Sequence, residues 1–118
     1  MKLVYVGGPY RALTEFGVHR NIQAAELWTV ELLRLGAAVI CPHKNTAYLG
    51  GAVSDKHVLA ADLEILRRCD AMFLIPGWWH SAGTLGEIAF ATEMGIPVFE
   101  RLEELAAWLD ANVEHVAA

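Results

Sequence analysis

The chain has 118 residues, of which 55% are hydrophobic and 19% are charged. This length and apolar fraction predict one globular domain over residues 1–118 with a sizeable core, and they exclude a disordered chain. Nine basic against fourteen acidic residues give a formal net charge of −5. Because no basic stripe runs along the chain, polymeric nucleic acid is not an expected partner.

The N-terminal stretch is short and turns early. Residues 1–6 lead directly into Gly7-Gly8-Pro9, so they have neither the apolar length nor the cleavage site of a signal peptide. No run approaches the roughly 20 apolar residues of a membrane span. We therefore expect a cytoplasmic protein with no membrane partner. Cys41 and Cys69 have no CxxC spacing and are expected to be reduced thiols.

The first half of the chain alternates strand, helix and strand patterns. Residues 3–6 predict a buried strand that ends in the turn 7–10. Apolar residues from Ile22 to Leu35 recur at helical spacing, and Gly36 is placed to end that helix. Residues 38–41 predict a short strand closed by Pro42, and the segment up to Gly51 predicts a loop or lid.

The second half repeats the alternation. Ser54 or Asp55 is placed to cap a helix whose apolar positions are Val58, Leu59, Leu63 and Leu66. The apolar run 71–75 predicts a strand buried on both faces, and a third helix follows the turn 76–87 and ends at Gly95. Residues 97–99 predict a fourth strand, and residues 100–112 a last amphipathic helix.

This alternation predicts a small doubly wound α/β domain, Rossmann-like or flavodoxin-like. We expect a parallel sheet of four or five strands with helices on both faces. Ligands of such sheets bind outside the carboxyl ends of the strands. That edge would collect the segments 7–11, 42–43 and 76–87.

The segment 76–87 is where we expect the chemistry. A strand, a turn of small residues and a helix start leave unpaired backbone N–H groups, which favour a negatively charged ligand group. Glu87 is expected in the first turn of that helix, where the dipole favours an ionised carboxylate. An alternative needs no chemistry, because Thr84-x-x-Glu87 also has the pattern of a capping box.

Three groups of residues carry a family resemblance that covers most of the chain. They are Tyr5-Val6-Gly7-Gly8-Pro9, the pair Asp62 and Asp70, and Ser81-x-Gly83-x-x-Gly86-Glu87. Together they resemble the nucleoside 2-deoxyribosyltransferase-like superfamily, and are most similar to its branch of nucleoside 5′-monophosphate N-glycosidases. The resemblance implies that Glu87 attacks C1′ of the sugar, that Tyr5 hydrogen-bonds Glu87, and that Asp62 assists at the base or sugar.

Within that superfamily, Ser81 resembles the monophosphate hydrolases, because the base-exchanging enzymes typically have an acid at this position. A carboxylate there would repel a 5′-phosphate, whereas a hydroxyl donates to it beside the N–H groups of Ala82 and Gly83. Arg11 matches a phosphate-binding arginine of that branch, and Gly8 and His43 complete the substrate-binding set. Pro9 departs from the pattern, since it replaces a hydroxyl residue that binds phosphate.

The resemblance implies cleavage of the N-glycosidic bond of a nucleoside 5′-monophosphate, or a related nucleoside, through a covalent glycosyl-Glu87 intermediate. The free base is released, and neither a metal nor a cofactor is needed. The alternatives are a deoxyribosyltransferase that exchanges bases, and a nucleotide-binding module without turnover. Residues 83–87 also match half of a phosphoribohydrolase signature.

The family usually forms homo-oligomers, so a dimer or larger assembly is expected, with Trp78 and Trp79 at an interface or stacked on a base. Taken singly, the candidate residues have simpler interpretations. Asp62 also fits a surface acid, Tyr5 a core aromatic residue and Arg11 a loop cation. His43 also fits a structural histidine.

Overall fold

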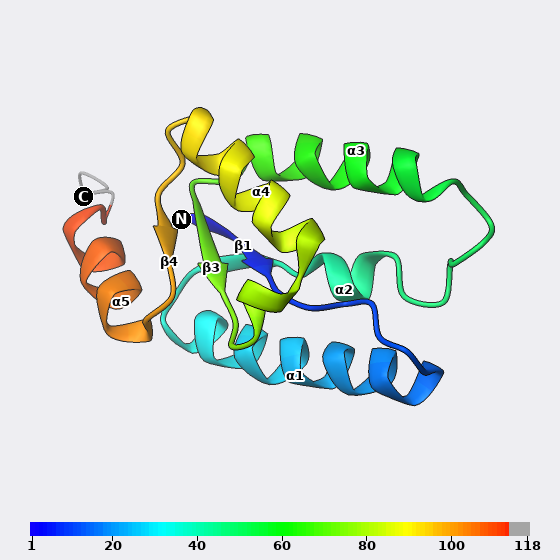
Figure 1. Ribbon diagram of the computed structural model, residues 1–118. Helices are drawn as coiled ribbons and strands as arrows, with labels where there is room; N and C mark the ends of the chain where they lie inside the picture. The colour runs from blue at the N-terminus through cyan, green and yellow to red at the C-terminus, as the bar shows by residue number, and fades with distance from the viewer. Residues whose placement is uncertain (114–118) are drawn as a thin grey trace.

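Four parallel strands form the sheet of the computed structural model, which describes residues 1–113 (Figure 1). They are β1 (Leu3–Gly7), β2 (Ala38–Ile40), β3 (Ala71–Leu74) and β4 (Val98–Phe99), in the order β2-β1-β3-β4. β1 lies in the middle, where Val4 pairs with Val39 on one side and with Ala71 on the other. The expected fold class is confirmed, with four strands.

Helices cover both faces of this sheet. Among the described residues they are α1 (Glu15–Arg34), α2 (Pro42–Asn45), α3 (Asp55–Arg67), the 3₁₀ helix η1 (Trp78–His80), α4 (Ala82–Glu93) and α5 (Leu102–Ala111). Figure 1 shows α1 and α5 on one face and α3 and α4 on the other. Over residues 1–113, no helix combines the length and apolar character that crossing a membrane requires.

Alternation along β1 builds two core layers. Val4 and Val6 pack with Ala25, Leu32 and Leu105 under α1 and α5, whereas Tyr5 packs with Leu66 and Ala91 under α3 and α4. Successive side chains of a strand point to opposite faces, so a strand with helices on both sides must be apolar throughout. This constraint places Tyr5, a residue with a polar end, inside the core.

Local capping decides where the helices begin and end. α1 begins at Glu15, earlier than the apolar spacing indicates, because the Thr14 side chain caps it by accepting from the Gly17 N–H at 3.0 Å. Pro42 opens the short helix α2, a position that suits its fixed φ, so the prediction of an irregular segment was wrong there. Gly36 and Gly95 have φ values of 90° and 74° and follow the ends of α1 and α4 as expected.

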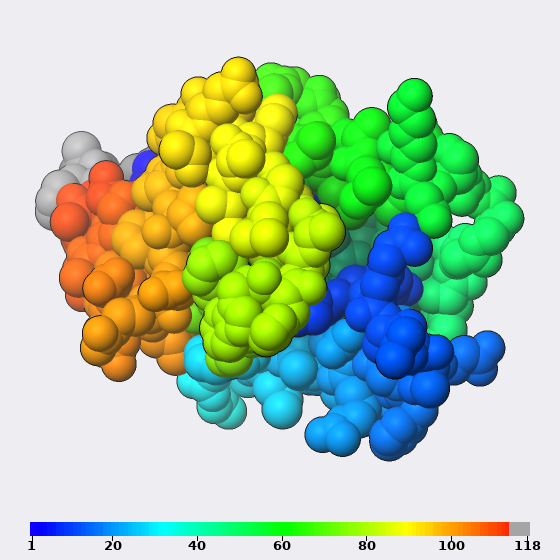
Figure 2. Space-filling model, viewed as in Figure 1, coloured from blue at the N-terminus to red at the C-terminus, as the bar shows by residue number. Residues whose placement is uncertain are grey.

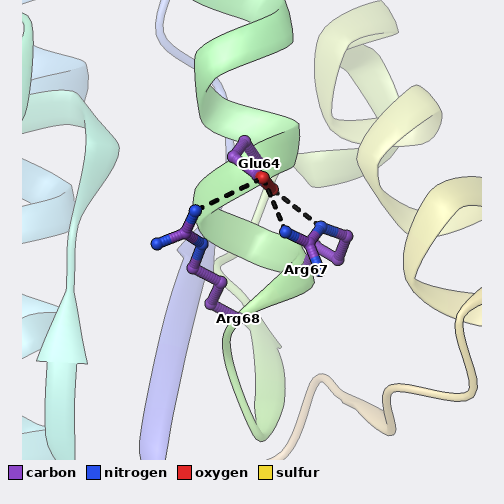
Figure 3. Close-up of polar contacts among 3 residues, drawn as sticks. All are labelled: Glu64, Arg67 and Arg68. Atoms are coloured by element: carbon purple, nitrogen blue, oxygen red, sulfur yellow. Dashed lines mark hydrogen bonds and ion pairs between the residues drawn. The ribbon is translucent and has the colours of Figure 1, made fainter.

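The last turn of α3 is closed by the ion pairs drawn in Figure 3. Glu64 accepts from Nε and Nη2 of Arg67 at 2.7 and 2.6 Å, and from Nη2 of Arg68 at 3.5 Å. The hydrogen bonds from Arg67 hold the pKa of Glu64 at about 2. Just beyond this turn, Asp70 accepts from the N–H of Leu3 at 2.8 Å, which ties the start of β1 to the start of β3.

Gly8 shows the tightest approach of backbone to core. A Cβ added there would lie 2.1 Å from Cγ1 of Ile75, a branched side chain that is itself buried. We predict that Gly8→Ala lowers the free energy of unfolding by about 1–3 kcal/mol, because the core must shift to admit the methyl group.

Gly86→Ala is the matched control, because a Cβ at Gly86 meets nothing within 4 Å and lies inside α4. It should raise stability by about 0.5–1 kcal/mol, since alanine is the better helix former. Urea denaturation of both variants checks this pair. Equal effects of the two substitutions would contradict the packing explanation.

Candidate functional site

A cleft of about 520 Å³ opens at the carboxyl ends of β1 and β3. In the sheet, β2 lies on one side of β1 and β3 on the other, so the strand order reverses direction at β1. The cleft lies at this switch point, where open α/β sheets bind ligands. Figure 2 shows the hollow between the blue β1–α1 connection, the green α3 and the yellow-green start of α4.

The lining residues come from four segments. They are Val6 and Pro9 to Arg11; Pro42, His43, Thr46, Leu49, Gly50 and Val53; Asp55, Val58, Leu59 and Asp62; and His80 to Thr84 with Glu87. The expected meeting of residues 7–11, 42–43 and 76–87 is confirmed in large part.

Glu87 lies on α4 and accepts a hydrogen bond from the hydroxyl of Tyr5, whose ring is fully buried in the sheet. Burial raises the pKa of Glu87 to about 7; the hydrogen bond from Tyr5 opposes this shift, and the charge of Asp62 adds to it. Because α4 begins at Ala82, Glu87 lies in the second turn of the helix. The predicted stabilisation of an ionised Glu87 by the first turn was therefore wrong.

Asp62 reaches the same cleft from α3. Burial raises the pKa of its carboxyl group, so Asp62 keeps its proton to a higher pH than an ordinary aspartate. Its Oδ1 atom is buried and has no hydrogen-bond partner in the described structure. Nearly all buried polar atoms in proteins are paired, so this unpaired oxygen is an unusual feature beside the cleft.

Ser81 is the N-cap residue of α4, and its hydroxyl oxygen is held by Thr84. Its Oγ accepts from the Thr84 N–H at 3.2 Å and from the Thr84 hydroxyl at 2.9 Å. Both acceptor positions are thus used, and the Ser81 hydroxyl still has its hydrogen to donate. The capping box expected between Thr84 and Glu87 was wrong, because Ser81 caps the helix and Glu87 pairs with Tyr5.

The start of α4 supplies further donors beside Ser81. Ala82 and Gly83 are its first two residues and line the cleft. In the first turn of a helix the backbone N–H groups have no partner within the helix. These N–H groups and the Ser81 hydroxyl together form a site that favours an anion.

His43 is buried, and its Nε2 lies 2.8 Å from the carbonyl oxygen of Pro9. A carbonyl only accepts, so Nε2 carries the proton, and burial lowers the pKa of the ring, which leaves Nδ1 as a bare acceptor. Nδ1 is buried without a partner in the described structure. His43 therefore makes a structural bond to the β1–α1 loop and also lines the cleft.

Arg11 lies at the mouth of the cleft, where its Nη2 is 2.9 Å from Oδ2 of Asp55. Gly8 was expected to bind substrate, but it is not among the residues that line the cleft. Close packing against Ile75 explains why a glycine is present at this position. Asp70 is bonded to Leu3 at the opposite edge of the sheet, away from the cleft. The sequence brought Asp62 and Asp70 together as a motif, and the structure separates them.

The apolar residues that line the cleft were not identified from the sequence. Val58 and Leu59 were taken as core positions of their helix, yet they line the cleft, together with Leu49 and Val53 from the preceding loop. A signal was present in the spacing, because Val58 lies one turn before Asp62 on the same helix face. These four side chains give the cleft an apolar wall.

The two tryptophans of η1 differ in their surroundings. Trp78 packs against the core layer under α3 and α4. It therefore contributes to the core of this chain, which neither a subunit interface nor stacking on a base requires. Trp79 is 54% exposed, and its ring lies 5.6 Å from that of His80, which lines the cleft. Trp79 is therefore the more exposed of the two, and neither tryptophan lines the cleft.

The raised pKa of Glu87 has a consequence for stability. Folding raises this pKa from 4.5 to about 7, so the folded state binds the proton more tightly, and stability is lost as the pH rises through this range. Glu87→Gln cannot ionise, and we predict that it raises the free energy of unfolding at pH 8 by up to about 3 kcal/mol. The gain should vanish near pH 4.

Urea denaturation at pH 4, 6 and 8 measures this difference. Glu93→Gln, an exposed position on the same helix, is the control and should change little at any pH. A pH-independent effect of Glu87→Gln would contradict the assigned burial of the charge.

Comparison with known proteins gives a family and a fold. Residues 2–101 match the family model described as "Domain of unknown function (DUF7768)", and the chain belongs to this family. No curated protein matches the chain. A 2-deoxyribosyltransferase from the psychrotolerant bacterium Bacillus psychrosaccharolyticus has a similar structure, with a TM-score of 0.64 and 20% sequence identity, over 95% of this chain and 92% of that one.

The solution structure of BlsM is also similar, with a TM-score of 0.61 and 20% identity, over 93% of this chain and 75% of that one. At this level of identity the likeness shows a shared fold. What the site does must be argued from its own residues.

Proposed function

We propose that this member of the DUF7768 family cleaves the N-glycosidic bond of a nucleoside 5′-monophosphate and releases the free base. The observation that carries the proposal is the buried hydrogen bond from Tyr5 to Glu87, which holds a carboxylate in the same cleft as Asp62 and the start of α4. A carboxyl group with a shifted pKa in a cleft is typical of catalytic sites. The fold shared with a 2-deoxyribosyltransferase supports a nucleoside-type ligand.

In the first step, an oxygen of ionised Glu87 attacks C1′ of the sugar, and the bond from C1′ to the base breaks. The electron pair of that bond stays on the base nitrogen, and the carboxyl group of Asp62, whose pKa burial raises, would deliver a proton to the base. The product is a glycosyl ester on Glu87. Tyr5 donates a hydrogen bond to the carboxylate before the attack and keeps its orientation fixed.

In the second step, water attacks C1′ and releases Glu87 as a carboxylate. Asp62, now ionised, accepts the proton of the attacking water. Two displacements at the same carbon retain its configuration, as in retaining glycosidases. The cycle returns each of the two carboxyl groups to its starting state.

The phosphate of the substrate would be bound at the start of α4. The Ser81 hydroxyl and the N–H groups of Ala82 and Gly83 are donors on the cleft surface, and Arg11 lies at its mouth. His43 and Asp62, which both line the cleft, would lie beside the hydroxyl or amino groups of the nucleoside. The apolar wall of Val58 and Leu59 offers a surface for the base.

Base exchange on deoxynucleosides is the second candidate, favoured by the 2-deoxyribosyltransferase among the similar structures. In that reaction a second base replaces water in the second step, and the Glu87 chemistry is unchanged. Homo-oligomer formation also stays a proposal, with exposed Trp79 as a candidate contact.

A panel of nucleotides and nucleosides, incubated with and without a second free base and analysed by chromatography, separates these candidates. We expect base release from nucleoside 5′-monophosphates without a second base. Exchange on unphosphorylated deoxynucleosides, without hydrolysis of monophosphates, would contradict the proposal in favour of base exchange.

Glu87→Gln should reduce base release by a factor of about 10³ or more, because an amide oxygen is a far weaker nucleophile than a carboxylate. Glu93→Gln, on the same helix, should keep wild-type activity. The measurement is initial-rate base release, with binding of the nucleotide followed in parallel. Binding without turnover in both the wild type and the variant would favour a non-catalytic module.

Tyr5→Phe should move the acidic limb of the pH–rate profile to higher pH. The Tyr5 hydrogen bond lowers the pKa of Glu87, so its loss raises that pKa above about 7, and more Glu87 is protonated at neutral pH. Activity near pH 6.5 should fall several-fold and partly recover near pH 8.5. A uniform loss at every pH, with no shift of the limb, would contradict this role of Tyr5.

A further inference from the structure

The ion pair between Arg11 and Asp55 joins opposite sides of the cleft. Arg11 belongs to the β1–α1 connection and Asp55 is the first residue of α3. Their charged groups are 2.9 Å apart, both residues line the cleft, and their side chains are 72% and 67% exposed. Figure 2 shows blue atoms from the N-terminal part of the chain close to green atoms of α3.

The backbone on the Arg11 side is held in place. The side-chain amide of Asn21 on α1 donates to the carbonyl of Tyr10 at 3.0 Å, and His43 donates to the carbonyl of Pro9. Asp55 is fixed in the first turn of α3, which Ser54 caps. The Arg11 side chain thus extends from a fixed backbone, and Asp55 is its anionic partner.

The charge balance of the cleft makes this choice matter. Arg11 is the only lysine or arginine among the residues that line the cleft in the described structure, whereas Asp55, Asp62 and Glu87 are all acidic. An anionic ligand that binds the Arg11 guanidinium must break the ion pair between Arg11 and Asp55. Exposed ion pairs are weak because water screens them, so a dianionic phosphate with several acceptor oxygens is a stronger partner for a guanidinium than one carboxylate.

We propose that Asp55 is a specificity-determining residue that competes with the ligand's phosphate for Arg11. A neutral nucleoside leaves the Arg11–Asp55 pair intact, and a phosphorylated ligand displaces Asp55 and recruits Arg11. At the mouth of the cleft, only a ligand that binds Arg11 more strongly than Asp55 does can therefore use Arg11. The inference rests on the proposed function for its ligand class, and it assigns a residue outside the proposed catalytic group.

The test is a binding measurement by calorimetry in the Glu87→Gln background, which prevents turnover. The probes are a nucleoside 5′-monophosphate, the matching nucleoside and inorganic phosphate. Asp55→Asn should lower the Kd of the monophosphate and of inorganic phosphate about 3- to 10-fold and leave that of the nucleoside unchanged. Asp110→Asn, which removes an exposed charge on α5, is the control and should change none of the three.

A double-mutant cycle with Arg11→Gln shows whether the effect passes through Arg11. Arg11→Gln should weaken binding of the monophosphate, and adding Asp55→Asn to it should bring no further gain. A gain that persists without Arg11 would mean plain repulsion by Asp55 and would overturn the inference. Unchanged or weaker anion binding by Asp55→Asn, or no anion binding by any variant, would overturn it as well.

The two proposals fail in different ways. Base release by the wild type, with no effect of Asp55→Asn on anion binding, removes the role of Asp55 and keeps the glycosidase. Tighter phosphate binding by Asp55→Asn, with no base release by the wild type, keeps the competition and removes the glycosidase.

Discussion

The hydrogen bond from Tyr5 to Glu87 is the interaction on which the site depends. β1 is an inner strand of a sheet covered on both faces, and its residues from Val4 to Gly7 are buried, so the Tyr5 hydroxyl must find a partner inside the protein. Glu87 is that partner, and the same bond holds its carboxylate at the cleft. Core packing and a candidate catalytic group are therefore coupled through one contact.

Around this bond the cleft retains several features that a purely structural core would avoid. Glu87 and Asp62 both have raised pKa values because burial disfavours their charges, and Oδ1 of Asp62 and Nδ1 of His43 are buried without partners in the described structure. Each of these lowers stability in the ligand-free state. These destabilising groups are concentrated in one cleft at the switch point of the sheet. Functional sites commonly contain groups that lower the stability of the folded protein.

The shared fold and the local chemistry contribute different parts of the functional proposal. The similarity to a 2-deoxyribosyltransferase concerns the scaffold, which positions the carboxyl ends of β1 and β3 beside the start of α4. The proposed preference for a phosphorylated ligand depends instead on local donors. The Ser81 hydroxyl accepts two hydrogen bonds from Thr84 and lies beside the first N–H groups of α4, where an anion is favoured.

The sequence by itself determined the α/β class, the parallel order of strands and helices, a cap at Ser54 or Asp55, and the glycine ends of α1 and α4, because apolar spacing and capping are local properties. It also indicated most of the segments that meet at the cleft. Only the tertiary structure decided the environment of each group there. It separated Asp70 from Asp62, moved Glu87 into the second turn of α4, and paired Arg11 with Asp55. The physical reason is that burial and hydrogen-bond partners come from residues far apart in the chain, as with Tyr5 and Glu87, and these set protonation and charge.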